Sequence, residues 1–428
     1  MKVIGQKAKN EYFVNLPSSK SISNRLLIIR YLAESNADIK NLSDSDDTFI
    51  LQSCLQTIAN KDLGNKNPVS FNCKNAGTST RFLLALLATE QGEWIIDADE
   101  RMNKRPILPL VEALQELGAD IKINSREKPF PIFIKGRQLS ANKDLVIENH
   151  FSSQTISALL LICSRIENGL RIKLPANQTS MPYINMTIQL LNNYGASIEK
   201  HDSFIVCKEF RPFFSDSEVE IDYSALCFLY SIVCVGQLNN VKIASLPQQS
   251  LQGDFMARKY FEKLGLEITQ SQNHTILSYD NSKVSKENKL EFDLKDTPDV
   301  FPSLAVASFF SGKEIEFKNL ASLNLKESAR LDNMARELNK MANRCIKTKE
   351  EFFISSFQQN KTPFYFDKGK KQLKFSSYND HRIAMALSVI SLIYNEIEID
   401  NTACVEKSWR NYWQDVNDFI LLGACESK

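Results

Sequence analysis

The chain has 428 residues, of which 43% are hydrophobic and 24% charged, a composition typical of a folded globular protein. This length exceeds what one hydrophobic core usually organises, so we expect two domains of about 200 residues each. Lysine plus arginine number 52 and aspartate plus glutamate 51, which gives a formal net charge of +1 at pH 7. A balance so close to zero gives no reason to expect nucleic acid or an anionic membrane as a partner.

The cysteines and the apolar runs indicate a reducing compartment. Nine cysteines are scattered singly, and none forms a CxxC or Cys/His spacing, so neither a disulfide framework nor a metal site is expected. The first ten residues hold three lysines and no apolar run, so we expect no signal peptide. The longest apolar runs are far shorter than the roughly 20 residues of a membrane span. We therefore expect a cytoplasmic protein.

The first segment with chemical character is LPSSKSISNR, residues 16–25, which leads into an apolar run. Serines before an apolar run predict the start of a helix, where backbone amides can face a bound anion. Lys20, Ser21 and Arg25 lie beside those amides, so charge and helix dipole both favour an anion there. A helix start that contacts only solvent is the alternative for this motif taken alone.

Two further motifs of the N-terminal half suit anion binding. NAGTSTR, residues 75–81, precedes an apolar helix, and its small residues let backbone amides approach an oxyanion closely. It is not a Walker A loop, because no GK[ST] follows. RMNKRP, residues 101–106, places three cations before a helix that Pro106 can open. A plain helix cap is the alternative for the first motif, and a surface charge run for the second.

One pattern recurs through the middle of the chain: the end of an amphipathic helix, a glycine and the start of a strand. It occurs around Gly118, Gly195 and Gly265, with a degenerate copy around Ala342, so that the four positions are 77, 70 and 77 residues apart. Glycine suits the left-handed residue that ends a helix, although such a join is common enough to recur by chance. The regular spacing favours repeated α/β units, about three in each domain.

Hydroxyl and amide groups precede two more helices. Ser152, Ser153 and Gln154 stand before an apolar run, and Ser180 opens the weaker motif SMPY. These groups could bind phosphate or ring hydroxyls, but capping of the helix is the simpler explanation.

Charged motifs follow in the C-terminal half. Asp299, in TPDV, presents a carboxylate at the start of a helical run. Lys326 and Arg330 are four residues apart, which predicts that they share one helix face beside Glu327. Like charges at this spacing repel each other, so the pair suits a site that holds a bound anion.

The last charged motif is NDHRIAM, residues 379–385, before an apolar helix. It combines an acid, a histidine and Arg382, although a lone histidine is more often structural. Lys407 adds one more cation near the end of the chain.

Taken in order, these motifs resemble the enolpyruvylshikimate-phosphate synthase (EPSP synthase) family over essentially the full length of the chain. The combination of KSxSNR, NAGT, KES and DHRxAM is highly specific. The matching segments are LPSSKSISNR, NAGTSTRF, RMNKRP, SSQ, SMPY, LQGD, TPDV, LKESAR, NDHRIAM and EKSW.

The resemblance implies an α/β protein in the form of a two-domain inside-out α/β barrel, each domain with three repeated βαβαββ units. In this family the chain begins in one domain, builds the other and then returns. We therefore expect residues 1–18 and 222–428 to form domain I and residues 19–221 to form domain II, with the active site in the cleft between them.

The implied activity is transfer of the enolpyruvyl group of phosphoenolpyruvate to the 5-hydroxyl of shikimate 3-phosphate, with release of phosphate. The catalytic residues would be Asp299, Glu327 and Lys20. Shikimate 3-phosphate would be held by Lys20, Ser21, Arg25, Ser152, Ser153, Gln154, Ser180, Asp299, Ser322 and Lys326. Phosphoenolpyruvate would be held by Lys20, Asn75, Gly77, Arg105, Gln154, Arg330, Arg382 and Lys407.

This chemistry needs no metal and no organic cofactor, and the expected protein is a monomer whose partners are its two substrates. Because Gly77 is retained, inhibition by glyphosate is also expected. Two alternatives remain at this point: a catalytically impaired homologue that binds phosphate ligands, and the sister transferase that acts on a UDP-sugar.

The chain departs from the usual family pattern at a few positions. Ser322 stands where many members have an asparagine that contacts the acceptor, which puts that one contact in doubt. The remaining departures are Ser18, Lys74, Phe82, Ala329 and Arg410.

Overall fold

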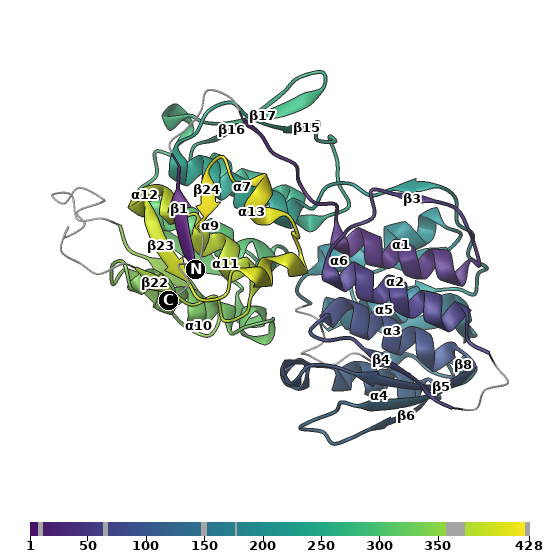
Figure 1. The fold of residues 1–428 in the computed structure, drawn as a ribbon. Helices are drawn as coiled ribbons and strands as arrows, with labels where there is room; N and C mark the ends of the chain where they lie inside the picture. Colours follow the sequence, from purple (N-terminus) through teal and green to yellow (C-terminus); the bar gives the residue numbers. More distant parts are fainter. Residues whose placement is uncertain (7–11, 63–66, 147–151, 176–177, 357–372, 424–428) are drawn as a thin grey trace. The chain divides into compact units, whose positions relative to one another are not determined.

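The computed structural model describes residues 1–6, 12–62, 67–146, 152–175, 178–356 and 373–423 (Figure 1). The chain divides into two compact units, which we call unit 1 and unit 2. Unit 1 comprises Met1–Pro17 and Ile221–Lys428, and unit 2 comprises Ser18–Glu220. No helix in the described part of the chain is long and apolar enough to cross a bilayer.

Among the described residues, five four-stranded sheets share a single strand order. In each sheet two strands pair in parallel, and the second of them is followed by two antiparallel neighbours. Unit 2 has two of these sheets. The strands of the first, in order across the sheet, are β4 (Val69–Asn72), β5 (Gly92–Asp97), β7 (Ile132–Gly136) and β6 (Asp120–Ile123). Those of the second are β9 (Leu145–Val146), β11 (Leu170–Lys173), β13 (Phe204–Cys207) and β12 (Ile198–Lys200). In unit 1 they are β2 (Tyr12–Phe13), β15 (Val241–Ala244), β17 (His274–Tyr279), β16 (Leu266–Gln270); β18 (Lys289–Asp293), β19 (Glu314–Lys318), β21 (Phe352–Ile354), β20 (Cys345–Lys347); and β22 (Lys374–Phe375), β23 (Glu396–Ile399), β1 (Lys2–Gly5), β24 (Ile420–Leu422).

Helices alternate with these strands. In unit 2 they are α1 (Lys20–Leu32), α2 (Asp46–Ala59), α3 (Gly77–Thr89), α4 (Leu108–Glu116), α5 (Ser153–Leu161) and α6 (Met181–Asn193), with 3₁₀ turns η1 (Glu100–Lys104) and η2 (Cys163–Arg165). In unit 1 they are α7 (Tyr223–Gly236), α8 (Arg258–Glu262), α9 (Phe301–Phe310), α10 (Arg330–Asn339), α11 (His381–Ser388), α12 (Ser391–Tyr394) and α13 (Tyr412–Asp415), with η3 (Gly253–Ala257), η4 (Asn281–Lys283), η5 (Pro298–Val300), η6 (Ala321–Leu325) and η7 (Ala403–Lys407).

The shared strand order reflects a repeated unit of the chain. In unit 2, the elements β4, α3, β5, α4, β6 and β7 follow one another as βαβαββ, and in unit 1 so do β18, α9, β19, α10, β20 and β21. The sheet with β22 and β23 takes its third strand, β1, from the start of the chain. Within the described residues, unit 2 adds two parallel pairs, β3 (Ile39–Lys40) with β14 (Ser217–Glu218) and β8 (Leu139–Ser140) with β10 (Ile166–Glu167).

The glycine pattern of the sequence marks these repeats. Gly118, Gly195 and Gly265 have φ of +97°, +105° and +100°, which L-residues rarely adopt. They follow α4, α6 and α8 and precede β6, β12 and β16, as the sequence predicts. The degenerate fourth position, Ala342, lies between α10 and β20.

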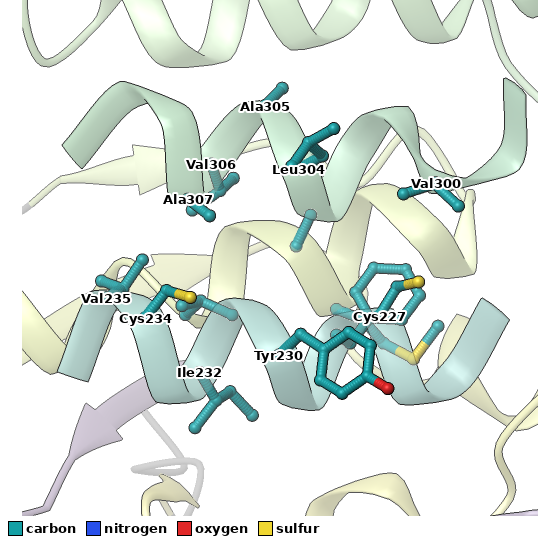
Figure 2. Packing of buried hydrophobic residues seen from close by; sticks show 14 of the residues in the cluster. Cys227, Tyr230, Ile232, Cys234, Val235, Val300, Leu304, Ala305, Val306 and Ala307 are labelled. Atoms are coloured by element: carbon teal, nitrogen blue, oxygen red, sulfur yellow. The ribbon is translucent and has the colours of Figure 1, made fainter. Parts of the chain in front are cut away.

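The first helix of each repeat is buried almost all round. In unit 1, α7, α9 and α11 pack on one another, and in unit 2 so do α1, α3 and α5. Figure 2 shows Cys227 of α7 near Val300 at one end of the helix pair and Val235 near Ala307 at the other, so α7 and α9 run parallel. Parallel buried helices add their dipoles, and their amino ends together favour negative charge. In unit 2 the motifs LPSSKSISNR, NAGTSTR and SSQ lie at these amino ends, and in unit 1 the motifs TPDV and NDHRIAM do.

Candidate active site

In unit 1 the polar residues gather around Arg330, whose side chain is 1% exposed at the start of α10. Its Nη1 donates to Asp299 Oδ1 at 2.7 Å, its Nη2 to Glu327 Oε2 at 2.5 Å and its Nε to Asp380 Oδ2 at 2.8 Å. Burial alone would lower the pKa of Arg330, but the negative charges of Asp380, Glu327 and Asp299 outweigh it and raise the pKa. The guanidinium is therefore fixed in place as a cation.

Asp299 in turn is surrounded by cations. Besides Arg330, it meets Lys326 Nζ at 3.4 Å and Arg382 Nη2 at 3.5 Å. Burial on its own would raise the pKa of Asp299, but Arg382, Lys326 and Arg330 outweigh it and hold that pKa well below its usual range. These cations therefore favour the ionised carboxylate of Asp299.

Two more predicted residues lie in unit 1. Lys407 Nζ is 3.2 Å from Glu327 Oε1, so Lys407 joins the same network. Ser322 lies in η6, and its Oγ is buried with no hydrogen-bonding partner among the described residues. The structure thus brings together Asp299, Lys326, Glu327, Arg330, Arg382 and Lys407.

One local prediction in this segment is wrong. Lys326 and Arg330 do not share a helix face, because α10 begins only at Arg330 and Lys326 has extended backbone (φ −83°, ψ −156°) after η6. The two cations meet instead through Asp299, which both of them contact. A spacing of four residues therefore indicated the right neighbours for the wrong reason.

Asp254, the last residue of the motif LQGD, lies near this network. Its side chain accepts a hydrogen bond from the hydroxyl of Ser224 near the start of α7. Burial, and then the negative charge of Asp299, raise the pKa of Asp254 to about 6. Asp254 therefore changes its charge close to neutral pH.

This raised pKa predicts a pH-dependent stability. Because the pKa of Asp254 is higher in the folded chain than in the unfolded chain (about 3.9), its favourable contribution is present at low pH and is lost as pH rises through about 6. Asp254→Asn keeps a hydrogen-bond acceptor for Ser224 but removes this titration. Relative to wild type, we expect the variant to gain about 1 kcal/mol of unfolding free energy between pH 5 and pH 7.5. Urea unfolding at pH 5 and pH 7.5 measures the unfolding free energy of both proteins. If the difference in unfolding free energy between variant and wild type is the same at both pH values, the prediction is wrong.

In unit 2 the first cluster surrounds the start of α1. Helix α1 begins at Lys20, within the segment 16–25 where a helix start is predicted, and Ser19 caps it by accepting from the backbone N–H of Ile22. Lys20 Nζ is 3.2 Å from Asp47 Oδ2, a buried carboxylate in the first turn of α2. Ser21 is the second residue of α1 and is half-buried.

Gly77 and Arg105 form a close contact at the start of α3. A Cβ added at Gly77 would overlap the guanidinium of Arg105, so no other residue fits there unless Arg105 moves. Asn75 lies two residues before the helix, and Lys74 before it has φ of +46°. Glycine adopts this left-handed backbone more readily than lysine does.

The second prediction that is wrong concerns the segment that carries Arg105. Pro106 does not open a helix, because α4 begins at Leu108 with Pro109 in its first turn. The preceding residues Glu100–Lys104 form a 3₁₀ turn, and Arg105 follows that turn with its side chain buried. Of the three cations, Arg105 is therefore buried, whereas Arg101 is half-buried and Lys104 is exposed.

Gln154 connects α5 to α3. Its Oε1 accepts from Arg81 Nη1 at 3.1 Å, and its Nε2 donates to Thr78 Oγ1 at 3.0 Å. Arg81 also donates to the carbonyl oxygens of Gly77 and Pro106, so one guanidinium ties three segments of the cluster together. Ser152 caps α5, and Ser153 is its first residue.

Arg25 lies deeper, one turn into α1. It donates to Thr187 Oγ1 at 2.7 Å, to Ser157 Oγ at 3.1 Å and to the carbonyl oxygens of Ser21 and Tyr183. Burial lowers the pKa of Arg25 to about 10. Ser180, at the start of α6, has φ of +57°.

Three residues of these clusters were not assigned from the sequence. Asp47 stands in an acidic helix start, Arg81 lies inside NAGTSTR, and Asp380 lies inside NDHRIAM. The motifs for Arg81 and Asp380 were recognised, but nothing local indicates which side chain of a motif turns inward. In the described residues, no group of three or more His, Cys, Asp or Glu side chains is arranged to hold a metal ion.

Both units are thus α/β bodies whose buried helices begin among cations, carboxylates and hydroxyls, which defines an anion-binding protein of repeated βαβαββ units. The family model described as EPSP synthase (3-phosphoshikimate 1-carboxyvinyltransferase) matches residues 6–416. The chain belongs to this family, and the family predicted from the motifs is confirmed.

Individual relatives agree. The chain is 33% identical over 408 residues to a 3-phosphoshikimate 1-carboxyvinyltransferase of Bacteroides fragilis strain YCH46, covering 94% of each chain. A protein of the same name from Tolumonas auensis is 28% identical over 425 residues, covering 95% of this chain and 96% of that protein. The solved EPSP synthase of Acinetobacter baumannii has the same fold, with a TM-score of 0.72 at 18% identity over 99% of this chain and all of that one.

Proposed function

We propose that this chain catalyses the reaction that names its family, the transfer of the enolpyruvyl group of phosphoenolpyruvate to shikimate 3-phosphate with release of phosphate. The observation that carries the proposal is the constellation of Asp299 with Arg330, Arg382 and Lys326 at the start of buried helices. It supplies an ionised base beside cations that suit phosphate and carboxylate.

The charges of the ligands explain the need for so many cations. Each substrate carries a phosphate and a carboxylate, so together they bring about five to six negative charges. Anions of this kind can leave water only where opposite charges and hydrogen bonds replace it. The candidate cations are Lys20, Arg25, Arg105, Lys326, Arg330, Arg382 and Lys407.

We propose that the clusters of the two units act on the same pair of ligands. Shikimate 3-phosphate would contact the hydroxyl and amide groups at the starts of α1, α5 and α6, together with Lys326, Asp299 and Ser322. Phosphoenolpyruvate would contact Gly77 and Arg105 from unit 2 and Arg330, Arg382 and Lys407 from unit 1. Arginine suits this second set, because its planar fork grips carboxylate and phosphate through paired hydrogen bonds.

The reaction then needs three proton transfers: the 5-hydroxyl loses a proton, the methylene carbon gains one, and the resulting methyl group loses one. Asp299 takes the proton of the 5-hydroxyl, and the hydroxyl oxygen forms a bond to C2 of phosphoenolpyruvate. The methylene carbon of phosphoenolpyruvate gains a proton through Glu327 and Lys20. The tetrahedral intermediate expels phosphate, and loss of a proton from the new methyl group restores the double bond. The surrounding cations stabilise the charge of the intermediate.

Ligand binding itself would prepare Asp299 for this role. In the chain alone, its cations hold its pKa so low that it is a poor base. Bound phosphate and carboxylate oxygens would share the charge of Arg330 and Arg382 and so raise the pKa of Asp299. The base would thus be strengthened only when substrate is in place.

Phosphate release tests the function directly. With both substrates present, we expect release of inorganic phosphate and formation of the enolpyruvyl ether, and with either substrate omitted we expect neither. Turnover with a UDP-sugar in place of shikimate 3-phosphate would assign the chain to the sister transferases. Binding of both substrates without phosphate release would indicate an impaired homologue.

A further inference from the structure

Two adjacent residues with unusual backbone precede the helix that carries Arg382. Tyr378 and Asn379 both have φ of +54°, and Asp380 follows them as the N-cap of α11. L-residues rarely adopt this conformation, and a non-glycine pair persists only where surrounding contacts hold it. Because the pair lies directly before α11, the contacts that hold this unusual backbone also hold the start of α11.

The first support is Glu337, a fully buried residue of α10. Its Oε1 accepts from the hydroxyl of Tyr378 at 2.6 Å, and its Oε2 accepts from the backbone N–H of Ser376 at 3.0 Å. Lys340 Nζ lies 2.5 Å from the same Oε2 and balances the charge. One carboxylate therefore holds both ends of the segment Ser376–Tyr378.

The second support is Asp400, at the end of β23. Its Oδ1 accepts from the backbone N–H of Ser377 at 2.8 Å and from the hydroxyl of Ser377 at 2.7 Å, and its Oδ2 accepts from the hydroxyl of Ser376. Asn401 donates from its side chain to Asn379 Oδ1 at 2.8 Å. The left-handed pair is thus held from two sides.

These contacts bind helix α10 to the segment Ser376–Asp380 at two points. Arg330 and Glu337 are seven residues apart, which is about two turns and so the same face of α10. Arg330 binds Asp380 through its Nε and Nη2, while Glu337 binds Tyr378 and Ser376. Asp380 also accepts from the backbone N–H of Arg382 at 3.1 Å.

We propose that Glu337 and Tyr378 are positioning residues, which set the place of Asp380 and thereby the directions of Arg330 and Arg382. The pair acts on the cluster around Asp299 through the backbone between Tyr378 and Arg382. This inference rests on the proposed function, in which Arg330 and Arg382 bind phosphoenolpyruvate.

Tyr378→Phe removes only the hydroxyl that Glu337 holds. We expect the KM for phosphoenolpyruvate to rise roughly tenfold, because small displacements of positioning groups cost one to two orders of magnitude. The KM for shikimate 3-phosphate should stay within about twofold of wild type, since its contacts lie mainly elsewhere. Tyr412→Phe is the control: it removes a fully buried hydroxyl, 2.7 Å from Ser388 Oγ at the far end of α11, and should leave both KM values unchanged.

A double-mutant comparison separates positioning from general damage. In an Arg382→Ala background the Tyr378→Phe change should raise the KM for phosphoenolpyruvate clearly less than tenfold, because one of the two groups that it positions is gone and only Arg330 remains. A full tenfold effect in that background, or a lowered melting temperature with unchanged KM in the single variant, overturns the inference.

The same set of variants also tests the assignment beneath the inference. If Arg382→Ala alone leaves the KM for phosphoenolpyruvate unchanged, the ligand assignment of Arg382 is wrong, whatever Tyr378→Phe does. If Arg382→Ala raises it and Tyr378→Phe does not, only the positioning role is lost. Glu337→Gln keeps an acceptor for the Tyr378 hydroxyl and should therefore be milder than Glu337→Ala.

Discussion

Replacement of Asp299 by asparagine is expected to lower kcat by about 10² to 10⁴-fold, the usual contribution of a positioned base. Both substrates should still bind, because the cations around Asp299 remain and lose their internal counter-charge. Phosphate release measures kcat, and calorimetric titration measures the two dissociation constants.

Asp296→Asn is the control for this change. Asp296 lies three residues earlier in the same segment and is exposed, so its replacement should leave kcat near that of wild type. A near-normal kcat for the Asp299 variant would remove Asp299 from the mechanism. A large loss of binding with normal kcat would make it a ligand contact only.

The second large effect concerns stability. Arg330→Ala leaves Asp299, Glu327 and Asp380 buried without the guanidinium that contacts all three. Removing one partner from a buried ionic network costs about 3 to 5 kcal/mol, because the remaining charges are not compensated. We therefore expect the urea concentration at the midpoint of unfolding of unit 1 to fall sharply. The fluorescence of Trp409 and Trp413, which lie in unit 1, reports this unfolding.

Two variants calibrate this measurement. Arg330→Lys keeps one charge but lacks the fork that reaches three carboxylates, so it should fall between wild type and the alanine variant. Lys374→Ala breaks an exposed ion pair with Glu398 in the same unit and should change the midpoint little. A midpoint for Arg330→Ala equal to that of Lys374→Ala would show that the network contributes no stability.

The helix starts were predictable because their signals are local. Lys20 and Ser153 each begin a helix where hydroxyl residues precede an apolar run, and Gly118, Gly195 and Gly265 end helices where a left-handed residue is needed. The order of the motifs sufficed to predict the family. The repeat was predictable for the same reason, since each copy carries its own cap.

The pairings within the site could not be predicted in this way. Asp380 is 50 residues from Arg330 in sequence, and only the tertiary fold, in which α10 and α11 both pack on α9, brings them to 2.8 Å. The helix predicted to hold Lys326 with Arg330 failed because charge spacing says nothing about backbone direction, and the chain is extended at Lys326. The tyrosine of the left-handed pair carries no local signal for positive φ either, since such residues are usually glycine or asparagine.

The strand β1 has a consequence for the order in which the protein is made. It pairs with β23 and with β24, so β1 cannot complete its sheet until Ile420–Leu422 have been synthesised. Unit 2 is one continuous segment and can fold during translation, whereas the nascent β1 must wait with its hydrogen-bonding edges open. Newly made chains are therefore most exposed to aggregation and to chaperones through unit 1.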